Sequence, residues 1–324
     1  MRVVFILLNI ILTVGSLFLS TSSFASYDWN IVQDGDGYGQ GFIVPNEFGY
    51  LSFVPYLKNQ NEVLISVGTF RAFQAASMGE FKYVFLFDYA AEVVQFNKML
   101  LDFIKLSRNR LHFLDLLFGT NRAYEKLENS NDSLLINELS LNEKNNLKKF
   151  LRKTIQLYKD PTTYGANFLT SDYYFEKVKY LASNNRFVLI NGSLSGEESL
   201  SDLSSLLKQR NLEVSVLDVS NAKDYIIWSK QLSNYYRNLK RLPWSKDAKV
   251  IWSVPAHIDY FVGQNIQNNW AYFGNPASDY VEFVQRLQNR DAQEVSRVYD
   301  QFHSQFMQYA LPKIFSCNKL LSNN

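Results

Sequence analysis

The sequence predicts an α/β protein built on a mainly parallel β-sheet, mixed at one edge, with helices on both faces. Short runs that are apolar throughout alternate with longer segments of helical periodicity. Glycine, aspartate or asparagine follows several of these runs and indicates a turn there. Strands that are apolar on both faces are typical of parallel sheets, which helices cover on both sides.

Five apolar runs are the predicted strands of this sheet. Their neighbours in the chain have the apolar spacing of helices, and one predicted helix separates most successive strands. The predicted strands are 63–67, 83–87, 186–190, 214–217 and 250–253.

The predicted helices include two that begin with a capping box, Ser140–Glu143 and Ser195–Glu198. Helices within about 108–182 form an insertion between the second and third strands. We expect one domain over 61–324, preceded over 26–60 by an irregular segment rich in Gly, Asn and Asp. The predicted helices are 70–78, 92–107, 111–118, 140–158, 171–182, 195–210, 222–239, 277–289 and 293–310.

The first 25 residues have the pattern of a secretory signal peptide. A basic start at Arg2 precedes an apolar run over 3–19, and small residues stand at Ser23 and Ala25. The run is a little short for a membrane-spanning helix, and no second run of that length follows. The sequence therefore predicts an exported protein, periplasmic or secreted, with no membrane span after cleavage.

Composition excludes several other classes. Lys and Arg total 33 against 31 for Asp and Glu, so no strongly basic surface is predicted and nucleic acid is not an expected partner. Cys317 is the only cysteine, which excludes an intramolecular disulfide. The three histidines are scattered and no zinc pattern exists, so we expect no metal.

Polar residues at the ends of the predicted strands are the candidate site. Gly68 ends the first strand, and Asp88 ends the second, twenty residues later. A glycine there lets a ligand approach the backbone, and a carboxylate at that spacing can accept both ribose hydroxyls of a nucleoside. The alternative is structural, with Gly68 as a plain turn and Asp88 as a cap of the helix that begins near Ala90.

Further candidates follow the same edge. Ser193 lies after the third strand, and Asn221 after the fourth, where many α/β enzymes hold their substrates. Arg71 lies at the start of a predicted helix, where it can bind a carboxylate or a phosphate.

The chain resembles class I S-adenosylmethionine-dependent methyltransferases, and more closely a little-characterised bacterial family of methyltransferase-like proteins. The order of elements and the pair Gly68 and Asp88 carry the resemblance, which covers about residues 40–255. The matching segments are 44–51, 64–68, 87–88, 93–97, 167–175 and 217–221.

This resemblance implies a Rossmann-like fold with S-adenosylmethionine as cofactor. It implies that Glu47 and Asn46 lie near the cofactor cleft, that Asp88 takes the ribose position, and that Asn221 lies on the substrate side. The expected cofactor-binding residues are Glu47, Gly68, Asp88 and Ser193, and those on the substrate side are Asn46, Arg71 and Asn221. The substrate, a small molecule or a protein, is not indicated, and no catalytic residue is assigned.

Three hypotheses remain open at this point. An exported methyltransferase-like enzyme requires open space beside Gly68, with Asp88 facing it. A non-catalytic binding protein on a degenerate scaffold predicts that Phe70 or Arg71 fills that space. An enzyme of another class predicts ionisable groups that converge elsewhere at the strand ends, since fold does not fix function.

Overall fold

The computed structural model describes seven stretches of the chain, which separates into two compact units, Met1–Asn30 and Ile31–Asn324. The fold and the site described below belong to the second unit. The described residues are 29–35, 54–57, 60–118, 167–222, 225–226, 231–256 and 269–288. The signal peptide, the helices predicted over 140–158 and 293–310, Asn46, Glu47 and Cys317 lie outside them.

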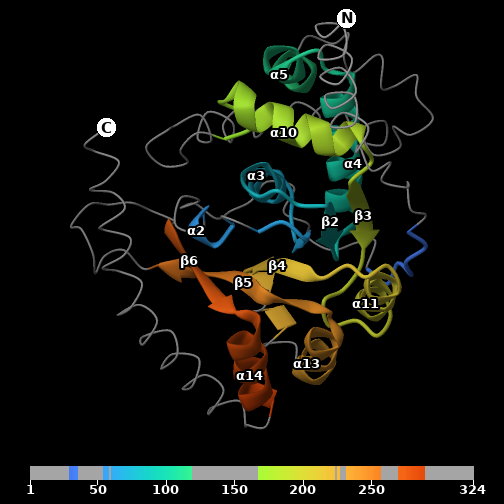
Figure 1. The fold of residues 1–324 in the computed structure, drawn as a ribbon, viewed down its shortest axis with the longest axis vertical. Coiled ribbons are helices and arrows are strands. Elements are labelled where there is room, and N and C mark those ends of the chain that lie inside the picture. Colours follow the sequence, from blue (N-terminus) through green and yellow to red (C-terminus); the bar gives the residue numbers. More distant parts are fainter. Residues whose placement is uncertain are drawn as a thin grey trace, which may run out of the picture. The chain divides into compact units, whose positions relative to one another are not determined.

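A six-stranded sheet with the order β3-β2-β1-β4-β5-β6 forms the centre of the second unit (Figure 1). Strands β1 to β5 pair in parallel, and β6 is antiparallel to β5. The prediction of a mainly parallel sheet, mixed at one edge, is therefore confirmed. The strands are β1 (Val63–Ser66), β2 (Tyr83–Asp88), β3 (Phe187–Asn191), β4 (Val214–Ser220), β5 (Trp244–Ala256) and β6 (Asn269–Pro276).

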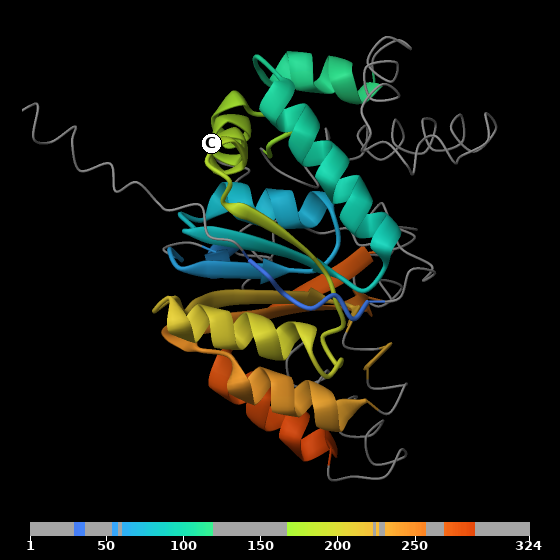
Figure 2. The ribbon, with the colours of Figure 1, turned by 90° about the vertical axis from the view of Figure 1, so that its right-hand side faces the viewer.

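Helices lie on both faces of this sheet (Figure 2). On one face α10 packs against α3 and α4, and α4 packs on β2 and β3. On the other face α13 packs against α11 and α14, and α14 packs on β5 and β6. The helices are α2 (Val54–Leu57), α3 (Phe70–Met78), α4 (Ala91–Leu106), α5 (Arg110–Phe118), α10 (Asp172–Ser183), α11 (Ser199–Gln209), α13 (Leu232–Arg241) and α14 (Ala277–Gln288).

The apolar runs form strands here because both of their faces are covered. Every residue of β1 and β4 is buried, as are the first five of β2. Aromatic rings fill the layer between the sheet and α10, where the ring centroid of Phe168 lies 6.3 Å from Phe70 and 5.9 Å from Phe73. Burial of this apolar surface is the main force that holds the layers together.

Two predicted helices differ from those observed. The capping box Ser195–Glu198 does not form, and α11 begins only at Ser199, with no side-chain cap from its own first residues. The helix predicted over 222–239 is not continuous, because Gln231 is not helical and α13 begins at Leu232. The sixth strand was not among the predicted strands, and β5 is longer than its predicted apolar run.

Within the described stretches, no helix has both the length and the apolar character needed to cross a membrane.

Candidate functional site at the carboxyl edge of the sheet

Strands β1 and β4 lie side by side at the point where the strand order reverses. From β1 the chain continues through β2 to β3 on one side, whereas β4 leads to β5 and β6 on the other. In open α/β sheets, ligands bind outside the carboxyl ends of the strands at such a switch point. Two residues with left-handed backbone lie there, Gly68 with φ +87° after β1 and Ser220 with φ +54° at the end of β4.

Gly68 forms a turn with open space beside it. A Cβ atom added to this glycine would meet no heavy atom of the described residues within 4 Å, apart from its chain neighbours. The turn is held by Asn97, whose Nδ2 donates a hydrogen bond of 2.9 Å to the carbonyl oxygen of Gly68. The hydrogen bond from Asn97 therefore holds the backbone at the end of β1 in place, while the open side of Gly68 leaves room for a ligand.

Asp88 holds the same turn from the neighbouring strand. Its Oδ2 accepts a hydrogen bond of 3.0 Å from the Gly68 N–H, and its Oδ1 accepts one of 3.0 Å from the Ala90 N–H. Burial raises the pKa of Asp88 to about 6, opposed by the hydrogen bonds from Ala90 and Gly68, the charge of Arg71 and the hydrogen bond from Tyr89. The carboxylate supports the start of α4, and its remaining lone pairs can accept further donors.

Arg71 lies in the core, in the first turn of α3. Only 3% of this residue is exposed, and its Nε donates to Oδ2 of Asp218 at 2.9 Å. Its Nη2 donates to the carbonyl oxygen of Val67 at 3.1 Å. The guanidinium, expected on the substrate side, thus joins the end of β1 to β4 from inside the core.

Asp218 is the centre of this buried network, and sequence reasoning assigned it no role. Besides Arg71, its Oδ2 accepts a hydrogen bond of 2.8 Å from Ser66 Oγ, and its Oδ1 accepts one of 3.2 Å from the Ser220 N–H. The signal was a carboxylate inside a mainly apolar strand, because buried charges need partners. The network fixes the backbone on both sides of the switch point.

Phe70 is fully buried and lies away from the open side of Gly68. Its ring packs edge-on against Phe96, with the centroids 5.9 Å apart. Neither Phe70 nor Arg71 fills the space beside Gly68, and apart from the chain neighbours of Gly68 no other residue in the described part of the chain comes within 4 Å of a Cβ atom placed there.

Ser193 lies in the loop between β3 and α11 and is engaged by a distant residue, Asp34. Oδ1 of Asp34 accepts a hydrogen bond of 2.9 Å from the Ser193 N–H, and Oδ2 accepts from the N–H groups of Glu198 and Ser199, both at 3.2 Å. Burial raises the pKa of Asp34, but the side chain of Ser199 and these three backbone donors together lower it below 3.8. Asp34 therefore supplies the cap that the box Ser195–Glu198 was expected to provide.

Residues 31–35 form a short segment without regular secondary structure, the N-terminal strap, that lies along the end of β3. Oε1 of Gln33 accepts a hydrogen bond of 2.5 Å from the Asn191 N–H, and the Gly35 N–H donates to the carbonyl oxygen of Asn191 at 3.2 Å. No local pattern could reveal this contact, because about 160 residues separate the strap from β3.

Asn221 is the last of the predicted site residues that the structure describes. Asn221 follows Ser220 at the end of β4, on the same edge as Gly68, and its Oδ1 lies 3.4 Å from Ser220 Oγ. The structure thus brings Gly68, Asp88, Ser193 and Asn221 to one edge of the sheet, whereas Asn46 and Glu47 are not described.

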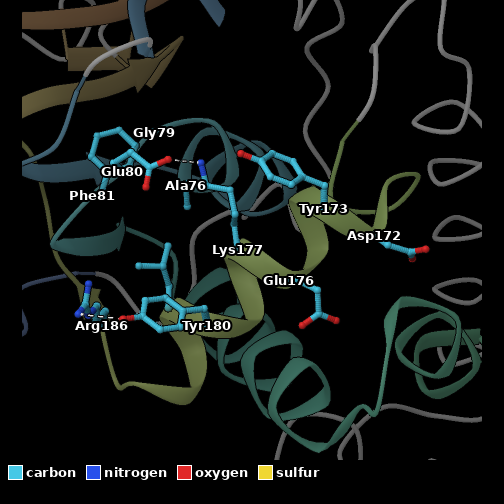
Figure 3. Close-up of a pocket in the computed structure, with 11 residues that line it drawn as sticks. Ala76, Gly79, Glu80, Phe81, Asp172, Tyr173, Glu176, Lys177, Tyr180 and Arg186 are labelled. Carbon is cyan, nitrogen blue, oxygen red and sulfur yellow. Dashed lines mark hydrogen bonds and ion pairs between the residues drawn. The ribbon is translucent and has the colours of Figure 1, made fainter. Parts of the chain in front are cut away.

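An open pocket of about 560 Å³ lies at the opposite, amino edge, between α3 and α10 (Figure 3). Lys177 crosses it, 2.6 Å from Oε1 of Glu80 and 5.6 Å from the ring centroid of Tyr173. Arg186 lies over the ring of Tyr180 at 5.2 Å. None of the predicted site residues lines this pocket.

Among the residues that the structure describes, no group of three or more His, Cys, Asp or Glu side chains could hold a metal ion.

Comparison with known proteins gives a family but no activity. No curated protein matches the sequence. A family model described as a domain of unknown function, DUF7790, matches residues 42–310. This match spans most of the chain and includes β1 to β6, so the protein belongs to the DUF7790 family.

Proposed function

We propose that this chain is an exported, methyltransferase-like protein that binds S-adenosylmethionine at the carboxyl edge of β1 and β2 and transfers its methyl group to a substrate. The observation that carries the proposal is the turn at Gly68, open on one side and bound to Asp88 on the other. A glycine turn beside a carboxylate at a switch point is compatible with a nucleoside ligand.

The strand order supports the proposal. A parallel run in the order β3-β2-β1-β4-β5 is that of Rossmann-like sheets, to which the sequence resemblance pointed. The antiparallel β6 takes the outer edge beside β5, far from the ends of β1 and β2. A Rossmann-like ligand site between β1, β2 and β4 is consistent with this order.

The residues present fit the nucleoside half of the cofactor. A left-handed glycine without a side chain lets a ligand reach the backbone, and the Asp88 carboxylate can accept hydrogen bonds from two ribose hydroxyls. When bound, S-adenosylmethionine supplies an electrophilic methyl group on a sulfonium centre. The chain's own part is to hold the ribose at Asp88 and to keep the ends of β1 and β4 rigid through Arg71 and Asp218.

A second candidate is a non-catalytic binding protein on the same scaffold. The specific observation in its favour is that Ser193, one of the expected cofactor-binding residues, donates its N–H to Asp34. Transfer of a labelled methyl group from S-adenosylmethionine to any protein or small-molecule acceptor separates the two candidates, since a binding protein retains the cofactor unchanged.

Replacing Asp88 with Ala is expected to weaken binding of S-adenosylhomocysteine by about 100-fold or more. Two hydrogen bonds to a charged acceptor are worth roughly 3 kcal/mol or more together, and about 1.4 kcal/mol corresponds to a factor of ten. The loss of the support for α4 should cost only about 1 kcal/mol of stability. Calorimetric titration of the purified full chain with S-adenosylmethionine and S-adenosylhomocysteine measures the first quantity, and urea unfolding measures the second.

The exposed Asp115→Ala on α5 is the matched control and should bind like the wild type. Gly68→Ala adds a methyl group on the open side of the turn and should also weaken binding. Failure of the folded wild-type protein to bind either compound would overturn the methyltransferase proposal.

The export part of the proposal predicts a defined mature N-terminus. When the full chain is produced in a bacterial host, the exported protein should begin at Ser26, because Ser23 and Ala25 fit the signal peptidase site. N-terminal sequencing of the periplasmic fraction and of the medium checks this. An Ala25→Arg variant should remain uncleaved, whereas an unprocessed wild-type chain confined to the cytosol would contradict export.

A further inference from the structure

The N-terminal strap is bound to the candidate site by a set of part-buried and exposed hydrogen bonds. Asp34 alone accepts hydrogen bonds from three successive parts of the β3–α11 loop, at Ser193, Glu198 and Ser199. On either side of it, Gln33 and Gly35 bond to the backbone of Asn191. A carboxylate at the start of a helix also meets the positive end of its dipole, so Asp34 fits α11 electrostatically.

The surrounding glycines are matched to this contact. A Cβ atom on Gly196 would lie 2.2 Å from Oδ2 of Asp34, which would force the carboxylate away from the loop. A Cβ atom on Gly35 would lie 2.6 Å from the carbonyl oxygen of Tyr89 and 2.3 Å from Nδ2 of Asn191. Tyr89 directly follows Asp88, so the strap reaches from β3 to the end of β2.

The strap therefore lies where a nucleoside held by Asp88 would extend. In the sheet, Asp88 pairs with Asn191, the residue that both Gln33 and Gly35 contact. On the β3 side of Asp88, a base attached to a ribose there would lie along the ends of β2 and β3, next to Tyr89 and Asn191. The side chain of Asn191 is itself engaged there, because its Nδ2 donates to the carbonyl oxygen of Tyr89 at 2.9 Å.

We propose that the N-terminal strap is an autoinhibitory latch, in which Asp34 holds residues 31–35 over the β2–β3 end of the ligand site until a ligand displaces them. This inference rests on the proposed function, since it concerns access to the same site. A ligand that binds only when the strap is released has an apparent affinity reduced by the fraction of molecules in the released state. The amides that Asp34 occupies become available when it leaves.

Two variants release the strap by different routes. Asp34→Ala removes the carboxylate, whereas Gly35→Ala keeps it and introduces a clash with the Tyr89 backbone. Glu197→Ala is the matched control, since it removes an exposed carboxylate from the same loop. All three changes are made in the full chain and compared with the wild type.

Hydrogen exchange measures whether the strap has been released from the β3–α11 loop. Calorimetric titration with S-adenosylhomocysteine measures whether release of the strap raises the affinity of the site. In Asp34→Ala and Gly35→Ala, the amides of Ser193 and Ser199 should exchange at least about tenfold faster, and S-adenosylhomocysteine should bind about tenfold more tightly. Glu197→Ala should change neither quantity.

Three results would overturn the proposal in distinguishable ways. Unchanged exchange at Ser193 and Ser199 in Asp34→Ala would mean that Asp34 is no latch. Faster exchange with equal affinity in all four proteins would mean that the strap does not inhibit, while the proposed function stands. Absence of binding in all four folded proteins would overturn the proposed function, and autoinhibition with it, whatever the exchange rates.

Discussion

Replacing Asp218 with Ala is expected to lower the free energy of unfolding by about 3–5 kcal/mol, because it breaks the buried ion pair of 2.9 Å between Asp218 and Arg71. Asp218 is fully buried, and Arg71 is 3% exposed, so water cannot take over the lost interaction. The change also removes the acceptor of Ser66 Oγ and of the Ser220 N–H. Urea unfolding followed by circular dichroism at neutral pH measures the difference.

Asp102→Ala on α4 is the matched control. It breaks an ion pair of 3.4 Å with Lys98, whose two side chains are 43% and 40% exposed, and exposed pairs contribute less than about 1 kcal/mol. The double variant Arg71→Leu with Asp218→Leu should recover most of the lost stability, because it removes both charges together. A single variant as stable as the control would contradict the view that this network holds β1 to β4.

The contribution of Asp88 to the free energy of unfolding is expected to fall as the pH rises from about pH 4 to pH 6. The folded pKa of Asp88 is about 6, above the ordinary 3.8, so the folded state binds a proton that the unfolded state has lost within that window. Ionisation of the buried Asp88 carboxyl lowers the stability of the folded state. This loss is absent below the pKa that Asp88 has in the unfolded state, and it is complete above the pKa that Asp88 has in the folded state. One pKa unit is worth 1.36 kcal/mol, so the loss reaches at most about 3 kcal/mol.

The measurement compares the wild type with Asp88→Asn, which keeps the shape but does not titrate. The stability of the wild type relative to this variant should rise by about 2 kcal/mol when the pH falls from about 7.5 to about 4.5. A difference that stays constant with pH would show that the Asp88 carboxyl titrates alike in the folded and unfolded chains.

Local patterns in the sequence carried much of the fold. The apolar runs at 63–67 and 83–87 became β1 and β2 with ends within one residue of those predicted. The helix over 70–78 matches α3. These elements are predictable because each apolar spacing is written within a few neighbouring residues, and burial on both faces of the sheet acts in the same direction as that spacing.

The sequence also placed Gly68 and Asp88 correctly relative to each other. Strands β1 and β2 are parallel neighbours, so their carboxyl ends lie at one edge of the sheet. Residues twenty positions apart therefore meet there, and the Gly68 N–H donates to Oδ2 of Asp88 at 3.0 Å. The functional and the structural interpretations of Asp88 are compatible, because one carboxylate accepts from both Gly68 and Ala90.

By itself, the sequence determined the class of sheet, the positions of five of its six strands and the polar residues at the ends of several of them. Only the tertiary structure decided what those residues contact. Arg71 turned into the core because Asp218, 147 residues further along, offers it a buried counter-charge. Asp34 replaced the box Ser195–Glu198 as the cap of α11 from 165 residues away. Packing of the whole chain decides which charges and amides meet. A pattern of a few neighbouring residues therefore does not identify these partners.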